Sequence, residues 1–384
     1  MLDVVQGVWL SKAVVVVEGG LISEVVPSPP EGADLLDLGD RSLLPGLIDT
    51  HTHIFLQGNR TSAEYAYQIL EEEPAHRVAR AVRSLGTALR HGFTCLRDLG
   101  TEGAGFGDVA LRQAVSEGVL TGPELLAAGP AIGARYSYPI AGYRSDWSFP
   151  VGVAECDGVE GCRREVRRQV ARGVDWVKVY ASAGPKSELN QDGYMDGPPP
   201  WTAAELSAIV DEAHARGVPV AAHAMTVSGT DMAVAAGVDS IEHGSAITPG
   251  TAEMMARRGI PLIPTLLALR EAPRISFANC LAAGVEVVFG TDVGAFRWED
   301  VNQAAEFRRM VEMGMSPLQT IRSATLNAAA LLRRQRELGE ISPGHRADLV
   351  ACSGDPLQDV GTLEAVDFVM KSGTVIHQAG RRPS

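Results

Sequence analysis

The sequence predicts an α/β fold: a (β/α)8 TIM barrel with a small composite β-sandwich domain built from both termini. Two observations support this prediction. In the middle of the chain, short apolar runs alternate with amphipathic helical patterns, which is the element order of parallel barrels. At both ends, β-rich runs are separated by glycine turns. The length of 384 residues can hold one barrel and one small accessory domain.

The end domain is expected to combine residues 1–45 with residues 345–384. A single β-hairpin is only marginally stable in isolation, so we expect the strands of the two ends to pair with each other. The expected strands are Val4–Leu10, Ala13–Glu18, Leu21–Val26, Ala347–Cys352, Val366–Lys371 and Thr374–His377.

The barrel is expected over residues 46–344. Eight apolar runs are its candidate strands: Leu43–Asp49, Thr94–Arg97, Glu124–Ala127, Trp176–Tyr180, Val218–His223, Ser240–His243, Leu262–Thr265 and Val287–Gly290. Helical patterns fill several of the gaps, at Ala75–His91, Glu160–Ala171, Ala203–Arg216 and Asn302–Met313.

Candidate metal ligands fall on or directly after five of these strands. His51 and His53 end the first strand, and residues two apart in a strand point to the same side, so both imidazoles can converge on one metal ion. The other candidates are Lys178, His223, His243 and Asp292. Each histidine alone could be a core residue and the aspartate a cap, but barrel active sites lie where the strands end. Together the six residues predict a metal centre.

Lys178 is the most unusual member of this set. Its neighbours Trp176, Val177 and Val179 predict a buried strand, where a bare ammonium is costly. Condensation of the neutral amine with CO2 would give an anionic carbamate that can bridge two metals. The alternatives are an ammonium that reaches solvent at the rim and a Schiff-base lysine.

These motifs resemble the amidohydrolase superfamily, within it the imidazolonepropionase-like and Xaa-Pro dipeptidase clade. The resemblance implies a barrel with a composite β-sandwich and usually a binuclear zinc site. His51 and His53 would bind the buried metal with Asp292, His223 and His243 would bind the outer metal, and carboxylated Lys178 would bridge both. The resemblance to this family rests on seven motifs: Pro45–His53, Val177–Gly184, His223-Ala224, Ile241–Gly244, Gly290–Asp292, Leu338–Gly344 and Ala347–Val350.

Two motifs depart from the dipeptidase pattern. The region 135–143 has no histidine where such members carry Gly-His-Gly, and Trp201 stands where a tyrosine is expected. The loops over the predicted barrel mouth are instead rich in aromatic side chains and poor in cations. We therefore expect an N-acyl amino acid or dipeptide-like amide with a hydrophobic or aromatic part. The candidate substrate residues are Arg135, Tyr143, Tyr180, Trp201 and Arg297.

The predicted reaction is the hydrolysis of an amide or peptide C–N bond of a small substrate by metal-bound hydroxide. Asp292 would transfer the proton to the leaving nitrogen. Arg97 and Asp98 are candidates to orient the ligands, and the alternative is that they form a structural ion pair. Three alternatives remain open: a lactonase, carbamate or phosphotriester hydrolase on the same centre, a metal-free lyase that uses Lys178 as a Schiff base, and a non-catalytic scaffold.

Composition excludes some partners. The net charge is −13 and no basic stripe occurs, which argues against nucleic acid and anionic membranes. Five scattered cysteines favour a reducing cytoplasm. We see neither a signal-peptide pattern nor an uncharged apolar run of about 18 residues. A homo-oligomer is compatible with the sequence.

Overall fold

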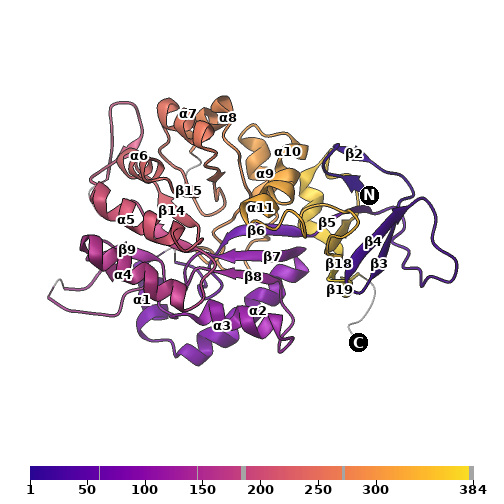
Figure 1. The fold of residues 1–384 in the computed structure, drawn as a ribbon, viewed down its shortest axis with the longest axis horizontal. Helices are drawn as coiled ribbons and strands as arrows, with labels where there is room; N and C mark the ends of the chain where they lie inside the picture. Colours follow the sequence, from indigo (N-terminus) through magenta and orange to yellow (C-terminus); the bar gives the residue numbers. More distant parts are fainter. Residues whose placement is uncertain (60, 145, 183–186, 270–272, 380–384) are drawn as a thin grey trace.

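The computed structural model describes residues 1–59, 61–144, 146–182, 187–269 and 273–379. Its centre consists of two parallel sheets (Figure 1). One has the order β6 (Leu47–Thr52), β7 (Phe93–Asp98), β8 (Glu124–Ala127). The other has the order β10 (Ala154–Cys156), β9 (Ile132–Ala134), β11 (Val177–Tyr180), β14 (Val220–Ala224), β15 (Ser240–His243), β16 (Leu262–Ile263). The predicted α/β class is confirmed.

Backbone hydrogen bonds join the two sheets at both edges. The amide of Asp175, just before β11, donates to Ala127 in β8 at 2.7 Å. On the other side, the amide of Val288 donates to Leu262 in β16 at 2.9 Å, and the amide of Thr50 in β6 donates to Phe289 at 3.1 Å. The segment 287–290, predicted as the eighth strand, therefore lies between β16 and β6. It forms an isolated bridge at Val287 and not a regular strand.

Helices surround these strands (Figure 1). The four predicted helices are present as α2, α4, α5 and α9, with shifted ends. Thr202 starts α5 with a capping box, in which its hydroxyl accepts from the amide of Glu205 and the Glu205 carboxylate accepts from the amide of Thr202. The helices are α1 (Ser62–Leu70), α2 (Pro74–Arg90), α3 (Gly107–Ser116), α4 (Gly158–Ala171), α5 (Ala203–His214), α6 (Val227–Ala236), α7 (Pro249–Arg258), α8 (Arg274–Ala283), α9 (Ala305–Glu312), α10 (Pro317–Ser323), α11 (Leu326–Leu331) and the 3-10 helix η1 (Val360–Ala365).

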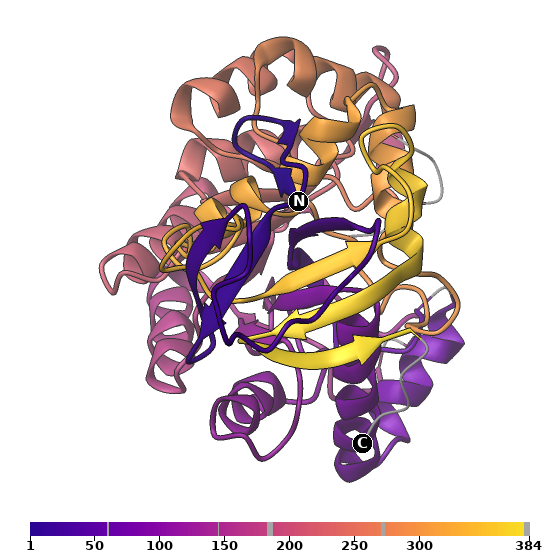
Figure 2. The ribbon, with the colours of Figure 1, turned by 90° about the vertical axis from the view of Figure 1, so that its right-hand side faces the viewer.

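The two ends of the chain share a sheet. A four-stranded antiparallel sheet has the order β19 (Thr374–Gln378), β18 (Val366–Lys371), β17 (Leu349–Cys352), β5 (Ser42–Pro45). The hairpin of β3 (Val14–Glu18) and β4 (Leu21–Val26) packs on it, with Ile22, Leu349 and Phe368 in one buried cluster. Figure 2 shows these N-terminal and C-terminal strands side by side. A separate short antiparallel pair is formed by β12 (Glu188–Leu189) and β13 (Met195–Asp196).

Besides the eighth strand, three predicted strands differ from the structure. The run Val4–Leu10 is replaced by β1 (Leu2–Asp3) and β2 (Val8–Trp9), because the Asp3 carboxylate accepts from the amides of Val5 and Gln6 and closes a turn. The run Leu43–Asp49 is divided at Gly46, where a side chain would lie 2.3 Å from Thr94 Oγ1.

The third, Leu262–Thr265, ends after Ile263, and Thr265 has a φ of 46°. Within the described ranges, no helix is both long and apolar enough to cross a bilayer.

Candidate metal centre

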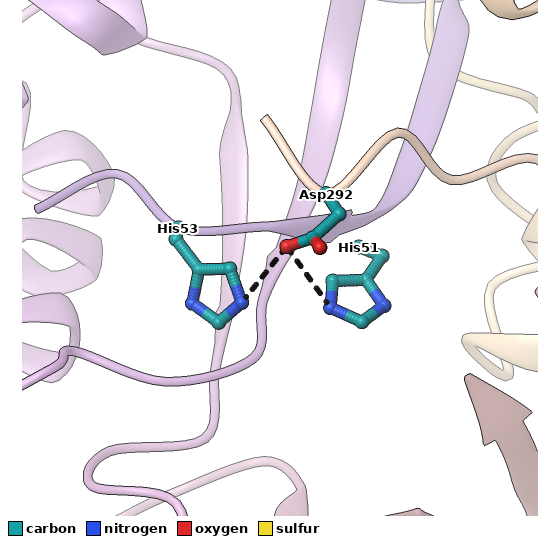
Figure 3. A group of neighbouring side chains, drawn as sticks. All are labelled: His51, His53 and Asp292. Atoms are coloured by element: carbon teal, nitrogen blue, oxygen red, sulfur yellow. Dashed lines mark ion pairs between the residues drawn. The ribbon is translucent and has the colours of Figure 1, made fainter. Parts of the chain in front are cut away.

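His51, His53 and Asp292 form one compact group of ligand atoms, all within 4.8 Å of one another (Figure 3). Asp292 Oδ1 lies 3.2 Å from His53 Nε2 and 3.6 Å from His51 Nε2. The backbone holds this arrangement: the amide of Asp292 donates to the carbonyl of His51 at 2.8 Å, and Asp292 has a φ of 57°. The carboxyl end of β6 and the segment after 287–290 thus place three metal-competent groups together.

His223 and His243 continue this group from the neighbouring strands. His223 lies in β14 and His243 ends β15, and the register pairs Ala224 with His243. The ring centroids of His223 and His243 are 4.6 Å apart, and those of His243 and His51 are 5.0 Å apart. The four predicted histidines therefore form one continuous cluster at the carboxyl ends of their strands.

Lys178 lies in β11, beside this cluster. Its side chain is 1% exposed, and its Nζ has no hydrogen-bond partner among the described residues. Burial lowers the pKa of Lys178 to about 8. A partnerless ammonium is costly in such surroundings, so the site suits a lysine whose nitrogen is neutral or modified.

Three of the histidines are held through Nδ1. His51 Nδ1 contacts Glu242 Oε2 at 2.7 Å, His53 Nδ1 contacts the carbonyl of Gly100 at 2.8 Å, and His243 Nδ1 contacts Thr265 Oγ1 at 2.7 Å. The Nε2 atoms of His51 and His53 face Asp292, and His51 Nε2 is buried without a hydrogen-bond partner among the described residues. This pattern is typical of metal-binding histidines, whose second nitrogen is fixed by an outer hydrogen bond.

Burial also sets the charge state of the rings. It lowers the pKa of His51 and His243 well below the usual value and that of His223 to about 3, so these imidazoles are neutral and able to bind a metal. At His53, burial lowers the pKa but the Asp292 carboxylate outweighs it and raises the pKa to about 9. The donor set fits divalent ions.

Glu242 is a functional candidate that sequence reasoning did not assign a role. It is fully buried and accepts from Arg97 Nη2 at 3.0 Å and from Ser240 Oγ at 2.6 Å, while its other oxygen holds His51. The sequence feature that could have indicated its role is a glutamate inside an apolar strand, one residue before the predicted ligand His243. Arg97, predicted to orient ligands, acts on His51 through Glu242. Asp98 accepts from the amide of Ile54 at 2.7 Å.

The structure separates the predicted substrate residues into two groups. Tyr180 and Trp201 are buried. The Tyr180 ring lies 4.8 Å from the His223 ring, and Trp201 Nε1 donates to the carbonyl of Tyr180 at 2.7 Å. The other three, Arg135, Tyr143 and Arg297, are exposed.

Arg135 pairs with Asp157 at 2.8 Å, and the Tyr143 ring packs against Trp147 and Phe149. Of the motif Val177–Gly184, residues 183 and 184 lie outside the described residues.

A separate cavity of about 240 Å³ lies at the opposite, amino ends of the strands. Trp176, Pro219, Asp239, Pro261 and Glu286 line it, and each directly precedes a strand segment. None of the predicted ligands contributes to it, so it is distinct from the candidate metal centre.

The chain is similar to several known proteins. Ochratoxinase from Aspergillus niger is 29% identical over 388 residues, which cover 89% of this chain and 77% of that protein. The crystal structure of a Xaa-Pro dipeptidase with bound methionine has 30% identity and a TM-score of 0.83, covering 94% of both chains. A prolidase complexed with N-methylphosphonate-L-proline has 29% identity and a TM-score of 0.87, covering 98% of this chain and 97% of that one.

Imidazolonepropionase from Thermoplasma acidophilum is 23% identical over 398 residues, covering 95% of this chain and 89% of that protein. The model of the amidohydrolase family matches residues 42–377. Since this match spans most of the sequence and agrees with the motifs that predicted it, the chain belongs to the amidohydrolase family and is a hydrolase.

Proposed function

We propose that this chain is a binuclear zinc-dependent amidohydrolase that cleaves an amide or peptide-type C–N bond of a small substrate. The observation that carries the proposal is the convergence of four histidines, Asp292 and a buried lysine at the carboxyl ends of the central strands. Six such groups exceed the four ligands that one tetrahedral zinc needs, so two ions are expected. His51, His53 and Asp292 would hold the inner ion, and His223 and His243 the outer ion.

Lys178 is proposed to be the bridging ligand, as a carbamate. The burial that lowers its pKa to about 8 increases the fraction of neutral amine, which is the form that condenses with CO2. The carbamate replaces a partnerless cation by an anion beside two divalent ions, and like-charge repulsion becomes attraction.

Two bound ions would polarise the scissile carbonyl and lower the pKa of a shared water toward neutrality. Asp292 is the group placed to accept the proton of that water and pass it to the leaving nitrogen. Its side chain is 15% exposed, whereas the His51 ring beside it is 0% exposed. Asp292 can therefore reach both the buried centre and a bound substrate.

The substrate is proposed to be an N-acyl amino acid or a dipeptide-like amide with a hydrophobic or aromatic part. The Tyr180 ring provides an aromatic surface beside His223, and Trp201 donates to the Tyr180 carbonyl. The relatives named ochratoxinase and Xaa-Pro dipeptidase support an amide-type substrate. A carboxylate on the substrate would need a cation. Arg297 suits this role better than Arg135, because Arg135 is already paired with Asp157, and Trp298 next to Arg297 donates to the carbonyl of His53 at 3.3 Å.

We further propose that residues 46–344 form a (β/α)8 barrel and that residues 1–45 and 345–384 form a composite β-sandwich. The hydrogen-bonded ring of strands and the shared terminal sheet support this division, although residues 380–384 lie outside the described residues. The cytoplasmic location and the homo-oligomer remain predictions.

The experiment that tests the function is a substrate screen with zinc-loaded protein. N-acyl amino acids, dipeptides, lactones, carbamates and phosphotriesters are compared by kcat/KM, with and without chelator. Turnover of an amide that stops with chelator supports the proposal. Faster turnover of a lactone, carbamate or phosphotriester contradicts the amide assignment. Borohydride trapping of a carbonyl substrate on metal-free protein would instead establish the Lys178 lyase.

A further inference from the structure

Glu102 is a buried carboxylate next to the metal centre that the proposed reaction does not use. It follows β7, it is 2% exposed, and it forms no ion pair among the described residues. Its two oxygens accept from two phenols: Oε2 from Tyr65 at 2.6 Å and Oε1 from Tyr180 at 3.0 Å. A buried carboxylate without a cationic partner is costly, so its retention in this place requires an explanation.

The backbone around Glu102 holds its side chain in this buried position. Its φ is 47°, a conformation that residues with a side chain rarely adopt. Arg77 Nη2 donates to the carbonyl of Glu102 at 2.7 Å and holds the turn. Gly152 covers the carboxylate from the other side, since a Cβ at Gly152 would lie 1.9 Å from Tyr65 Oη and 2.5 Å from Glu102 Oε2. Tyr65, Gly152 and Tyr180, from three separate segments, thus enclose the Glu102 carboxylate.

The contacts of Glu102 lead to a ligand of the proposed outer ion. Glu102 accepts from the hydroxyl of Tyr180, whose ring lies 4.8 Å from the ring of His223. The inner ligand His53 is instead held by the backbone carbonyl of Gly100, which a change of the Glu102 side chain leaves in place. His223 differs from the other three histidines because no described Nδ1 hydrogen bond orients its ring. Ring packing, against Tyr180 at 4.8 Å and His243 at 4.6 Å, is therefore the described contact that can orient the His223 ring.

We propose that Glu102 is a positioning residue for the outer metal ion, which it acts on by fixing Tyr180 against His223. This inference rests on the proposed function, because it requires a second ion on His223 and His243. It predicts that the affinity for the outer ion, rather than that for the inner ion, depends on Glu102.

Competition between metal-free protein and a chromophoric chelator for Zn²⁺ tests directly whether the affinity for the outer ion depends on Glu102. The two binding steps are resolved in the wild type, and the outer step is identified as the one lost in His223→Ala. Glu102→Gln should raise the Kd of the outer step by about 10–100-fold, the usual effect of removing an outer hydrogen-bond partner. The inner step should change by less than about threefold. Tyr180→Phe keeps the ring but removes the hydroxyl that Glu102 holds, so it should also weaken the outer step and leave the inner step nearly unchanged.

Tyr65→Phe is the matched control. It removes the other phenol bond to the same carboxylate without touching Tyr180, and both steps should stay within about twofold. Unchanged zinc affinities in Glu102→Gln would overturn the proposal. Equal weakening of both steps, or a Tyr65→Phe effect as large as that of Tyr180→Phe, would also overturn it and indicate a general structural role. A wild-type protein that binds only one zinc ion, or none, would overturn the binuclear function itself.

Discussion

His51 Nδ1 and Glu242 Oε2 lie 2.7 Å apart, and both side chains are fully buried. Glu242 is held in turn by Arg97 at 3.0 Å, and the Arg97 guanidinium stacks 4.3 Å from the centroid of the Trp176 ring. This chain of contacts links β6, β7 and β15 behind the metal centre. It fixes which His51 nitrogen faces the centre, because Nδ1 is occupied and Nε2 is free.

Replacement of Glu242 by glutamine should lower the affinity of the protein for the inner metal ion. The change removes the carboxylate that makes His51 a stronger ligand and leaves Arg97 without its charge partner, so we expect a loss of about 10–100-fold in affinity. Chelator competition measures it. Glu253→Gln, at an exposed glutamate paired with Arg257, is the control and should bind metal as the wild type does. Normal affinity in Glu242→Gln would show that the contact serves folding alone.

Lys178→Ala should lose the bridging ligand. We expect at least ~10-fold weaker metal binding and a matching loss of activity, and short carboxylates added in solution should restore part of both. Mass spectrometry under native conditions and a CO2-dependence of activity in the wild type provide independent readouts. Full activity of Lys178→Ala, or a structure with an unmodified ammonium far from the metals, contradicts the carbamate.

Asp292→Asn should lower kcat by about 10²–10⁴-fold, the usual contribution of a general base. Much of the metal should remain, since the four histidines and the lysine are intact. Asp300→Asn, at an exposed position eight residues along the chain, is the control. A kcat close to that of the wild type in Asp292→Asn would place the proton transfer elsewhere, and Asp98 would be the next residue to test.

Substrate preference is tested by comparing a hydrophobic N-acyl amino acid with Ala-Pro and Gly-Pro. We expect a higher kcat/KM for the N-acyl amino acid, because aromatic rings lie beside the centre. Arg297→Gln should raise KM for this substrate with little change in kcat, as loss of a carboxylate contact would. Arg135→Gln should have little effect, because Arg135 pairs with Asp157. Faster turnover of the small dipeptides would contradict the substrate assignment.

The sequence was sufficient to place the ligands on the strands because their spacing is local. His51 lies in β6 and His53 directly follows it, and the predicted ends of Ser240–His243 agree with those of β15. The eighth strand was less regular than expected, with an isolated bridge at Val287, and the backbone after it has a positive φ at Asp292.

Contacts between distant residues were not predictable in this way. The sequence gives no indication that Glu242 would reach His51, or that Glu102 would hold Tyr65 and Tyr180. Those contacts depend on how separate strands and loops come together in three dimensions. The exposure of Arg135 and Tyr143 likewise depends on the path of the loop that carries them.

Metal analysis of protein purified without chelator tests the binuclear centre most directly. The wild type should contain close to two divalent ions per chain, predominantly zinc, and complete chelation should abolish amide hydrolysis. The double change His51→Ala with His53→Ala should remove at least the inner ion. Hydrolysis that survives complete chelation, or wild-type protein without bound metal that remains active, would contradict the binuclear metal centre.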